Sequence, residues 1–167
     1  MLYLVRHAHA GSKAKWNGPD VARPLSAQGS REALGLVEQL RAHPIGRVLS
    51  SPAERCLQTV QPLAARLGRP VEPSEALGVD GAGPGVVELL RDPALDRAAL
   101  CTHGEVIGEV IGEVIGELER AGLELSGPRR WPKGCTWIVE LVGGHGWRGT
   151  YLEPLVVEPA APGSTPH

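Results

Sequence analysis

An arginine and two histidines stand directly behind a short apolar run in "LVRHAHAG", residues 4–11. At the end of a strand, such a group can bind a metal through His7 and His9, use one imidazole as a nucleophile on phosphorus, or simply mark the chain's exit from the core. A zinc site needs three or four protein ligands. The sequence has no HExxH motif and no Asp/Cys/His cluster to complete one, so we predict no metal here.

The phosphate alternative draws on residues that lie far along the chain. A phosphomonoester dianion is best held by arginines, which donate two hydrogen bonds in a fork, and Arg6 and Arg55 are available. An attacking imidazole must be neutral, and nearby cations favour that form because they disfavour protonation. His103 stands at the start of a predicted helix, where it can donate to an anion together with the backbone N–H groups from Gly104 onward. With His7 as the nucleophile, these residues fit one phosphate site.

Predicted strands and helices alternate along the chain and place these residues. Apolar runs and turn residues predict strands over 2–5, 47–51, 69–73, 98–102, 135–142 and 147–154, and helices over 26–43, 52–68, 85–92 and from 104 onward. This alternation predicts an α/β fold, a three-layer, doubly wound α/β/α arrangement around a mostly parallel central sheet. Ligands of such sheets bind beyond the carboxyl ends of the strands. The clusters "RHAH", "SSPAER" and "THGE" each follow a strand, so we expect them to meet at one edge.

The composition predicts an ordinary globular domain. The 167 residues suffice for one domain, predicted over 1–158, and the tail "PAAPGSTPH" (159–167) lacks the apolar content to pack and is predicted to be disordered. A net charge of −2 without a basic block argues against non-specific nucleic-acid binding, and no stretch is long enough to span a membrane. The three cysteines are odd in number and widely separated, which predicts buried thiols in a reducing compartment. We expect a cytoplasmic protein.

The tandem "GEVIGEVIGEVIGELE" (104–119) predicts a helix with one acidic face. Its glutamates recur every four residues, and each like-charged pair costs ~0.2–0.5 kcal/mol, so they should face water. The valines and isoleucines should then face the sheet. The glycines at 108, 112 and 116 either allow close packing or weaken the helix by roughly 1 kcal/mol each. We interpret the tandem as an expanded short repeat, which says little about chemistry.

Four separated segments carry a family resemblance. "LVRHAHAG", "RPLSAQG", "LSSPAERCLQT" and "CTHGEVIG" resemble, in this order, the signature segments of the histidine phosphatase superfamily, also called phosphoglycerate-mutase-like. The resemblance runs from residue 2 to about residue 115. It implies the doubly wound α/β fold and a reaction that requires no metal or other cofactor.

The resemblance also implies roles for individual residues. His7 would be phosphorylated during turnover, while Arg6, Arg55 and His103 hold the phosphoryl group through two in-line displacements. In the loop after the nucleophile, family members contact phosphate or substrate. The matching residues here are Ser12, Lys13, Lys15 and Asn17, and Gly104 is expected to contribute its backbone N–H.

Two features depart from the family pattern. Ala8 stands where the glycine after the nucleophile is usual, and no general acid is evident. Larger members supply a Glu or Asp from the segment before the late histidine, where this chain offers Glu75, Asp80 and Glu88 without a recognisable motif. We choose Asp80 and keep Glu105 as a further option. Substrates whose leaving groups have a low pKa, such as phosphoramidates, need less help from an acid.

The compact chain resembles most closely the small SixA-type phosphohistidine phosphatases. It also resembles the histidine phosphatase domain that follows the Nudix domain in some nucleotide-cleaning hydrolases. A phosphohistidine phosphatase is therefore expected, with a phosphorylated protein or small phosphate ester as its partner and no prediction of an oligomeric state. The alternatives are a phosphatase of small phosphometabolites or nucleotides and, in another class, a phosphate-binding module without catalysis.

Overall fold

The computed structural model of the chain describes residues 1–81, 88–89, 91–120, 127–143 and 146–158. Half of the predicted helix over 85–92 lies outside the described residues, of which 88 and 89 are helical. The tail 159–167 lies entirely outside them. The other predicted strands and helices are present, with shifts of at most three residues at their ends.

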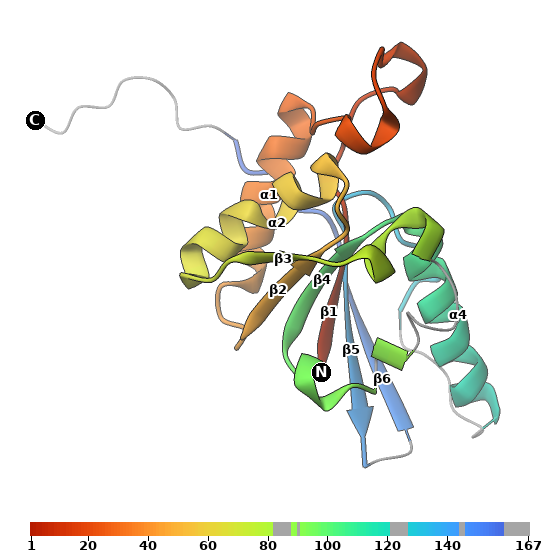
Figure 1. Cartoon of the computed structure of the whole chain (residues 1–167). Helices are drawn as coiled ribbons and strands as arrows, with labels where there is room; N and C mark the ends of the chain where they lie inside the picture. The colour runs from red at the N-terminus through yellow and green to blue at the C-terminus, as the bar shows by residue number, and fades with distance from the viewer. Residues whose placement is uncertain (82–87, 90, 121–126, 144–145, 159–167) are drawn as a thin grey trace, which may run out of the picture.

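A six-stranded sheet in the order β3-β2-β4-β1-β5-β6 forms the centre of the fold (Figure 1). The first four strands in that order run parallel, while β5 and β6 form an antiparallel hairpin that joins the sheet along β1. The predicted mostly parallel sheet is therefore confirmed. The strands are β1 Leu2–Arg6, β2 Arg47–Ser50, β3 Val71–Pro73, β4 Ala98–Thr102, β5 Thr136–Val142 and β6 Gly146–Leu152.

Helices cover both faces of the sheet, which confirms the three-layer arrangement (Figure 1). Alternate residues of β1 point to opposite faces, as the period of a strand requires. Leu2 and Leu4 pack with α4 (Gly104–Arg120), whereas Tyr3 and Val5 pack with α1 (Ala27–Leu40) and α2 (Glu54–Leu67). β1 is therefore buried on both sides, and its carboxyl end emerges from the middle of the molecule.

The start of α1 is fixed by the segment that follows β1. The Ser26 side chain caps the helix by accepting a hydrogen bond from Gly29 N at 3.1 Å. Gly29 is in direct contact with the chain after β1, since a Cβ built on it would lie 2.0 Å from the carbonyl oxygen of His9. Gly35 makes a similar contact further along, where the carbonyl of Leu155 would meet a Cβ at 1.7 Å. The segment after β6 is thus docked on α1.

α2 begins two residues later than the sequence suggested. Ala53 keeps an extended backbone, so the helix starts at Glu54 and not at Pro52. Its end is as predicted, because Gly68 adopts the left-handed conformation (φ 62°) in which glycine has no steric penalty. Pro62 lies within the helix without ending it.

α4 holds the tandem repeat, and the glutamates whose side chains the structure describes face water, as predicted. Glu105, Glu109 and Glu113 are exposed. The valines and isoleucines from 106 to 114 are buried against the sheet. No helix among the described residues has the length and apolar character needed to cross a membrane.

Three carboxyl strand ends meet at one edge of the sheet. β4 lies between β1 and β2 and runs parallel to both, so the residues after these three strands are neighbours. His7 follows β1, Ser51 follows β2 and His103 follows β4. The expected convergence of "RHAH", "SSPAER" and "THGE" is therefore present in the fold.

Candidate active site

His7 lies at the end of β1 with its side chain almost fully buried, 5% exposed. Its backbone N–H donates to the Thr102 carbonyl at 3.0 Å, which fixes it beside the end of β4. Its ring Nδ1 lies 2.8 Å from the carbonyl oxygen of Ala8. Because a carbonyl oxygen can only accept a hydrogen bond, Nδ1 carries the proton and Nε2 keeps its lone pair. The hydrogen bond therefore leaves Nε2 as the ring nitrogen with a free lone pair.

The surroundings of His7 keep this imidazole neutral. Burial lowers the pKa of His7, the hydrogen bond to Ala8 opposes that effect, and the charges of Arg55 and Arg6 lower it further, to about 3. The imidazole is thus unprotonated at neutral pH, which is the form required of a nucleophile.

Acidification is expected to destabilise the fold through this group. Unfolded His7 takes up a proton near pH 6.5, whereas folded His7 does so only near pH 3. The unfolded state therefore binds more protons between these values, and the free energy of unfolding falls as the pH drops. At about 1.36 kcal/mol per pKa unit, this group removes about 3 kcal/mol between pH 7 and pH 4. Urea unfolding at both pH values should show a loss smaller by that amount in His7→Gln, and equal losses in the two proteins would contradict the expectation.

Arg6 and Arg55 border the same cleft from different elements. Arg6 is the last residue of β1, and its Nη1 donates to the Trp131 carbonyl at 2.7 Å. Arg55 lies in the first turn of α2 and is 4% exposed. The Nε atoms of both guanidiniums are buried and have no hydrogen-bond partner among the described residues. One half-buried cation, Arg6, and one buried cation, Arg55, therefore stand at the opening beside His7.

His103 completes the group from the end of β4. It is 2% exposed, and its ring centroid lies 5.4 Å from that of His7 with the planes at 65°. Its Nδ1 lies 3.3 Å from Arg55 Nη2, and its Nε2 lies 2.9 Å from Ser51 Oγ. Since a guanidinium only donates, Nδ1 accepts here, and Nε2 donates to the serine. Ser51, His103 and Arg55 are thus linked in one chain of hydrogen bonds.

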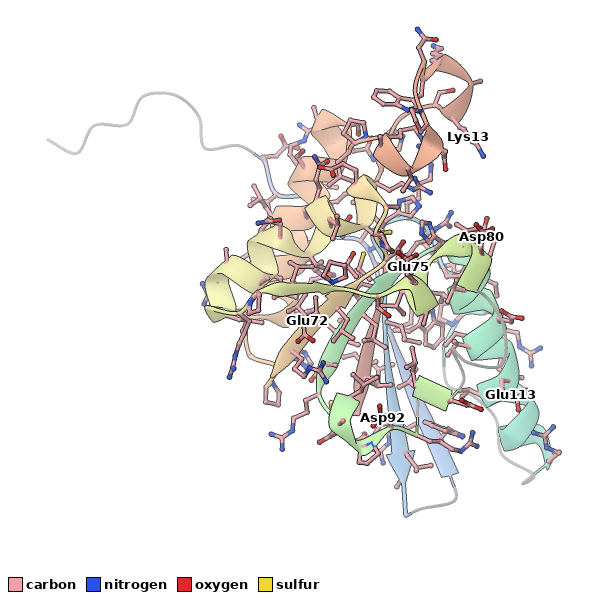
Figure 2. All side chains as sticks on the ribbon, viewed as in Figure 1. Lys13, Glu72, Glu75, Asp80, Asp92 and Glu113 are labelled. Atoms are coloured by element: carbon pink, nitrogen blue, oxygen red, sulfur yellow. The ribbon has the colours of Figure 1, made fainter. Side chains whose placement is uncertain are left out.

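These side chains open into a cleft of about 540 Å³ at the carboxyl edge of the sheet. One wall belongs to the segment around η1 (Lys13–Lys15) and η2 (Asp20–Ala22), and the other to η3 (Glu75–Leu77) and η4 (Val79–Gly81). Figure 2 shows Lys13 on the first wall and Glu75 and Asp80 on the second. The cleft is lined by Arg6, His7, Lys13, Asp20, Val21, Arg23, Ser51, Pro52, Ala53, Arg55, Glu75, Gly78, Val79, Asp80, His103, Glu105 and Lys133.

Asp20, an acidic residue that the sequence did not suggest, forms ion pairs with Arg23 and Arg55 at the cleft. The Asp20 carboxylate accepts from Arg55 Nη2 at 3.1 Å and from Arg23 Nε at 3.0 Å, and its backbone carbonyl accepts from Arg55 Nη1 at 2.8 Å. Slight burial raises the pKa of Asp20, but its two arginine partners outweigh this effect and lower it. The only hint in the sequence is the position of "DVAR" directly before the "PLSAQG" turn.

Hydrogen bonds behind the cleft hold the segment after β1 and the turn before α1 in place. Thr59 Oγ1 accepts from Ala8 N at 3.0 Å, and Gln58 Oε1 accepts from Leu25 N at 2.8 Å. The buried Glu32 accepts from His9 N at 2.8 Å. These contacts explain why the "QT" of the α2 motif accompanies Arg55, although neither residue lines the cleft.

The two histidines of the opening motif have separate environments. His9 Nδ1 lies 2.7 Å from Ser26 Oγ, so its ring belongs to the start of α1. It does not line the cleft that contains His7. In the part of the chain that the structure describes, no group of three or more His, Cys, Asp or Glu side chains is placed to hold a metal ion. The three cysteines are free and buried.

The remaining predicted site residues divide between the cleft and its surroundings. Lys13 and Asp80 line the cleft, as do the acid alternatives Glu75 and Glu105. Asn17 is exposed and does not line it, and the same holds for Glu88. Ser12 and Lys15 line a separate shallow hollow beside Trp16. Gly104 lies against the Arg6 guanidinium, where a Cβ would be 2.8 Å from Cζ.

Known proteins are similar in both sequence and fold. Residues 2–78 match the model of the histidine phosphatase superfamily (branch 1). Over 162 residues, 92% of this chain, the sequence is 33% identical to an 8-oxo-(d)GTP phosphatase of Mycolicibacterium smegmatis. The chain spans 48% of the length of that curated relative.

Solved structures show the same fold at lower sequence identity. A SixA protein from Nakamurella multipartitia is 27% identical with a TM-score of 0.66, covering 96% of both chains. A SixA protein from Agrobacterium tumefaciens is 24% identical with a TM-score of 0.69, covering 92% of this chain and 97% of its own.

The family model spans the first three sequence motifs and ends before the fourth. The fold supplies the fourth, because β4 delivers His103 to the ring of His7 and the guanidinium of Arg55. All four motifs therefore meet at one sheet edge in a fold shared with SixA proteins. In sequence over residues 2–78 and in fold over the described chain, the protein matches the histidine phosphatase superfamily.

Proposed function

We propose that this chain is a metal-independent phosphatase that works through a phosphohistidine intermediate. The observation that carries the proposal is the state of His7: Nδ1 donates to Ala8, and the pKa is lowered to about 3, so Nε2 is a free nucleophile at neutral pH. A module that only binds phosphate has no use for a neutral imidazole among arginines.

The chemistry proceeds in two displacements. Nε2 of His7 forms a bond to phosphorus while the bond to the leaving group breaks, and the leaving group accepts a proton. Water then attacks the phosphorus of phosphohistidine, the P–N bond breaks, and inorganic phosphate leaves with the imidazole neutral again. Arg6 and Arg55 offset the charge on the phosphoryl oxygens in both steps, and His103 stands beside them.

The acidic residues of the cleft favour a phosphoramidate as the substrate. Glu75, Asp80 and Glu105 are exposed at its rim, and Asp20 is engaged by two arginines. None of these four is buried next to His7, where a strong general acid would be expected. A phosphohistidine residue needs little protonation help, and the exposed rim leaves room for a protein that carries it. We therefore propose a SixA-type phosphohistidine phosphatase, with Asp80 as the residue that delivers the proton.

A second substrate class is supported by one comparison. The relative of 33% identity is named an 8-oxo-(d)GTP phosphatase, and Lys13, Arg23 and Lys133 line the cleft. These cations could hold the further phosphates of a nucleotide. Because this chain spans about half of that relative, the nucleotide activity is the alternative.

The test compares three substrates in the presence of EDTA. We expect turnover of p-nitrophenyl phosphate, a kcat/KM at least tenfold higher for a protein phosphorylated on histidine, and slower release of phosphate from 8-oxo-dGTP. A preference for the nucleotide would favour the alternative substrate. Binding of orthophosphate without hydrolysis of any substrate would overturn the phosphatase proposal, and loss of activity on chelation would overturn its metal independence. Asp80→Asn should lose more kcat with an alkyl phosphate monoester, whose alkoxide leaving group needs a proton, than with p-nitrophenyl phosphate, whose leaving group departs without one.

A further inference from the structure

The guanidinium of Arg6 is held by main-chain groups from two distant segments. Its Nη1 donates to the Trp131 carbonyl at 2.7 Å. From the other side, Gly104 leaves the space that the guanidinium occupies, since a Cβ there would lie 2.8 Å from Cζ. The direction in which Arg6 points therefore depends on where the backbone at Trp131 lies.

The Trp131 side chain packs against α4. Its half-buried indole lies against Gly108, where a Cβ would approach Cζ2 to 2.9 Å. The preceding residue is anchored from the core, because the indole N–H of Trp137 donates to the Arg130 carbonyl at 3.0 Å. The contact with Gly108 thus sets how closely the segment that holds Arg6 approaches the cleft.

The same segment also braces the nucleophile strand. Gly134 N donates to the His7 carbonyl at 3.1 Å, and Arg6 N donates to the Cys135 carbonyl at 3.0 Å. These two backbone bonds hold β1 and His7 in place. The Arg6 side chain is instead bonded to the Trp131 carbonyl, so a displacement of Trp131 moves the guanidinium and leaves the backbone of β1 where it is.

The other glycines of the repeat have no such contact. Gly112 occupies the equivalent position one repeat later, and a Cβ there would meet nothing within 4 Å. At Gly116 the nearest atom is the flexible Arg120 Nη1 at 3.5 Å. Of the glycines of the repeat at 104, 108, 112 and 116, Gly104 lies against Arg6 and Gly108 against Trp131, whereas Gly112 and Gly116 lie against neither.

We propose that Gly108 is a positioning residue for the phosphate site. Because it has no side chain, the Trp131 indole packs closely against α4, and the Trp131 carbonyl then holds the Arg6 guanidinium in the direction of the cleft. This inference rests on the proposed function, in which Arg6 holds the phosphoryl group. Gly108 and Trp131 make no contact with the substrate in this arrangement and act only through Arg6.

The test pairs Gly108→Ala with Gly112→Ala, the same substitution one repeat along. Gly112→Ala should leave orthophosphate affinity and kcat/KM unchanged and raise the thermal midpoint, because alanine favours an exposed helix position. Gly108→Ala should weaken orthophosphate binding and lower kcat/KM, each by roughly ten- to a hundredfold. A shift of about 1 Å in the Arg6 guanidinium is enough to misalign its hydrogen bonds to the phosphate. Equal behaviour of the two variants would overturn the proposal.

A double-mutant cycle with Arg6→Ala separates positioning from general damage. Orthophosphate affinity, measured calorimetrically, should fall in Arg6→Ala and fall no further when Gly108→Ala is added, since the contact between Gly108 and Trp131 acts through the Arg6 side chain that is now missing. The same fold-loss in both backgrounds would show a merely structural role. Trp131→Phe added to Gly108→Ala should restore affinity, because the smaller ring makes room for the new methyl group.

Two readouts keep this inference distinct from the proposed function. If the wild type binds orthophosphate but hydrolyses nothing, the phosphatase proposal fails while the binding cycle still tests Gly108. If Gly108→Ala does not fold, Trp131→Ala removes the indole without adding an atom to α4, and it should weaken orthophosphate binding. Unchanged orthophosphate affinity in Trp131→Ala would show that the contact between Trp131 and Gly108 does not position Arg6.

Discussion

Replacing His7 by alanine is expected to abolish turnover, with kcat reduced by roughly 10⁴-fold or more. The variant lacks the only atom proposed to form a bond to phosphorus, so no phosphoenzyme can accumulate. The arginines and His103 remain, so orthophosphate should still bind. Stopped-time assays with p-nitrophenyl phosphate and mass spectrometry of acid-labile phosphate on the protein measure both quantities.

His9→Ala is the matched control for this prediction. His9 lies two residues further along, but its ring is bonded to Ser26 at the start of α1 and does not line the cleft. We expect kcat and phosphoenzyme formation to stay near wild type, with a loss of stability of about 1 kcal/mol from the missing hydrogen bond. A phosphoenzyme that persists in His7→Ala, or one that disappears in His9→Ala instead, would show that the nucleophile has been assigned to the wrong histidine.

The strand ends of this site could be predicted because burial and chemistry coincide in the sequence. β1, β2 and β4 are short apolar runs buried on both faces, and each is followed at once by polar side chains. A parallel sheet brings such ends to one edge whatever the loops do. His7, Arg55 and His103 could therefore be grouped before any coordinates were known.

The loop partners of these residues could not be predicted in the same way. Asp20 reaches Arg55 across 35 positions from a segment without hydrophobic periodicity, so nothing local fixes its direction. The contact of Trp131 with Gly108 likewise depends on how the segment before β5 folds back over α4. In both cases a side chain is placed by tertiary packing of a loop, and the sequence pattern of strands and helices carries no information about it.

Arg55→Ala is expected to weaken orthophosphate binding by about 3 kcal/mol, on the order of a hundredfold in Kd. The substitution removes a buried cation, which is 4% exposed beside His7 and His103. It also leaves the Asp20 carboxylate without one of its two arginine partners at the edge of the cleft. Calorimetric titration with orthophosphate measures the loss.

Two further variants separate the effects of Arg55. Asp20→Asn added to Arg55→Ala should recover part of the affinity, because it removes a negative charge that repels the phosphate dianion. Arg47→Ala is the control, since Arg47 pairs with Glu72 at 2.6 Å and does not line the cleft. Orthophosphate affinity should be unchanged in that variant. If Arg55→Ala and Arg47→Ala bind orthophosphate equally well, Arg55 is not a phosphate clamp, and its ion pair with Asp20 serves only to close the η2 segment over α2.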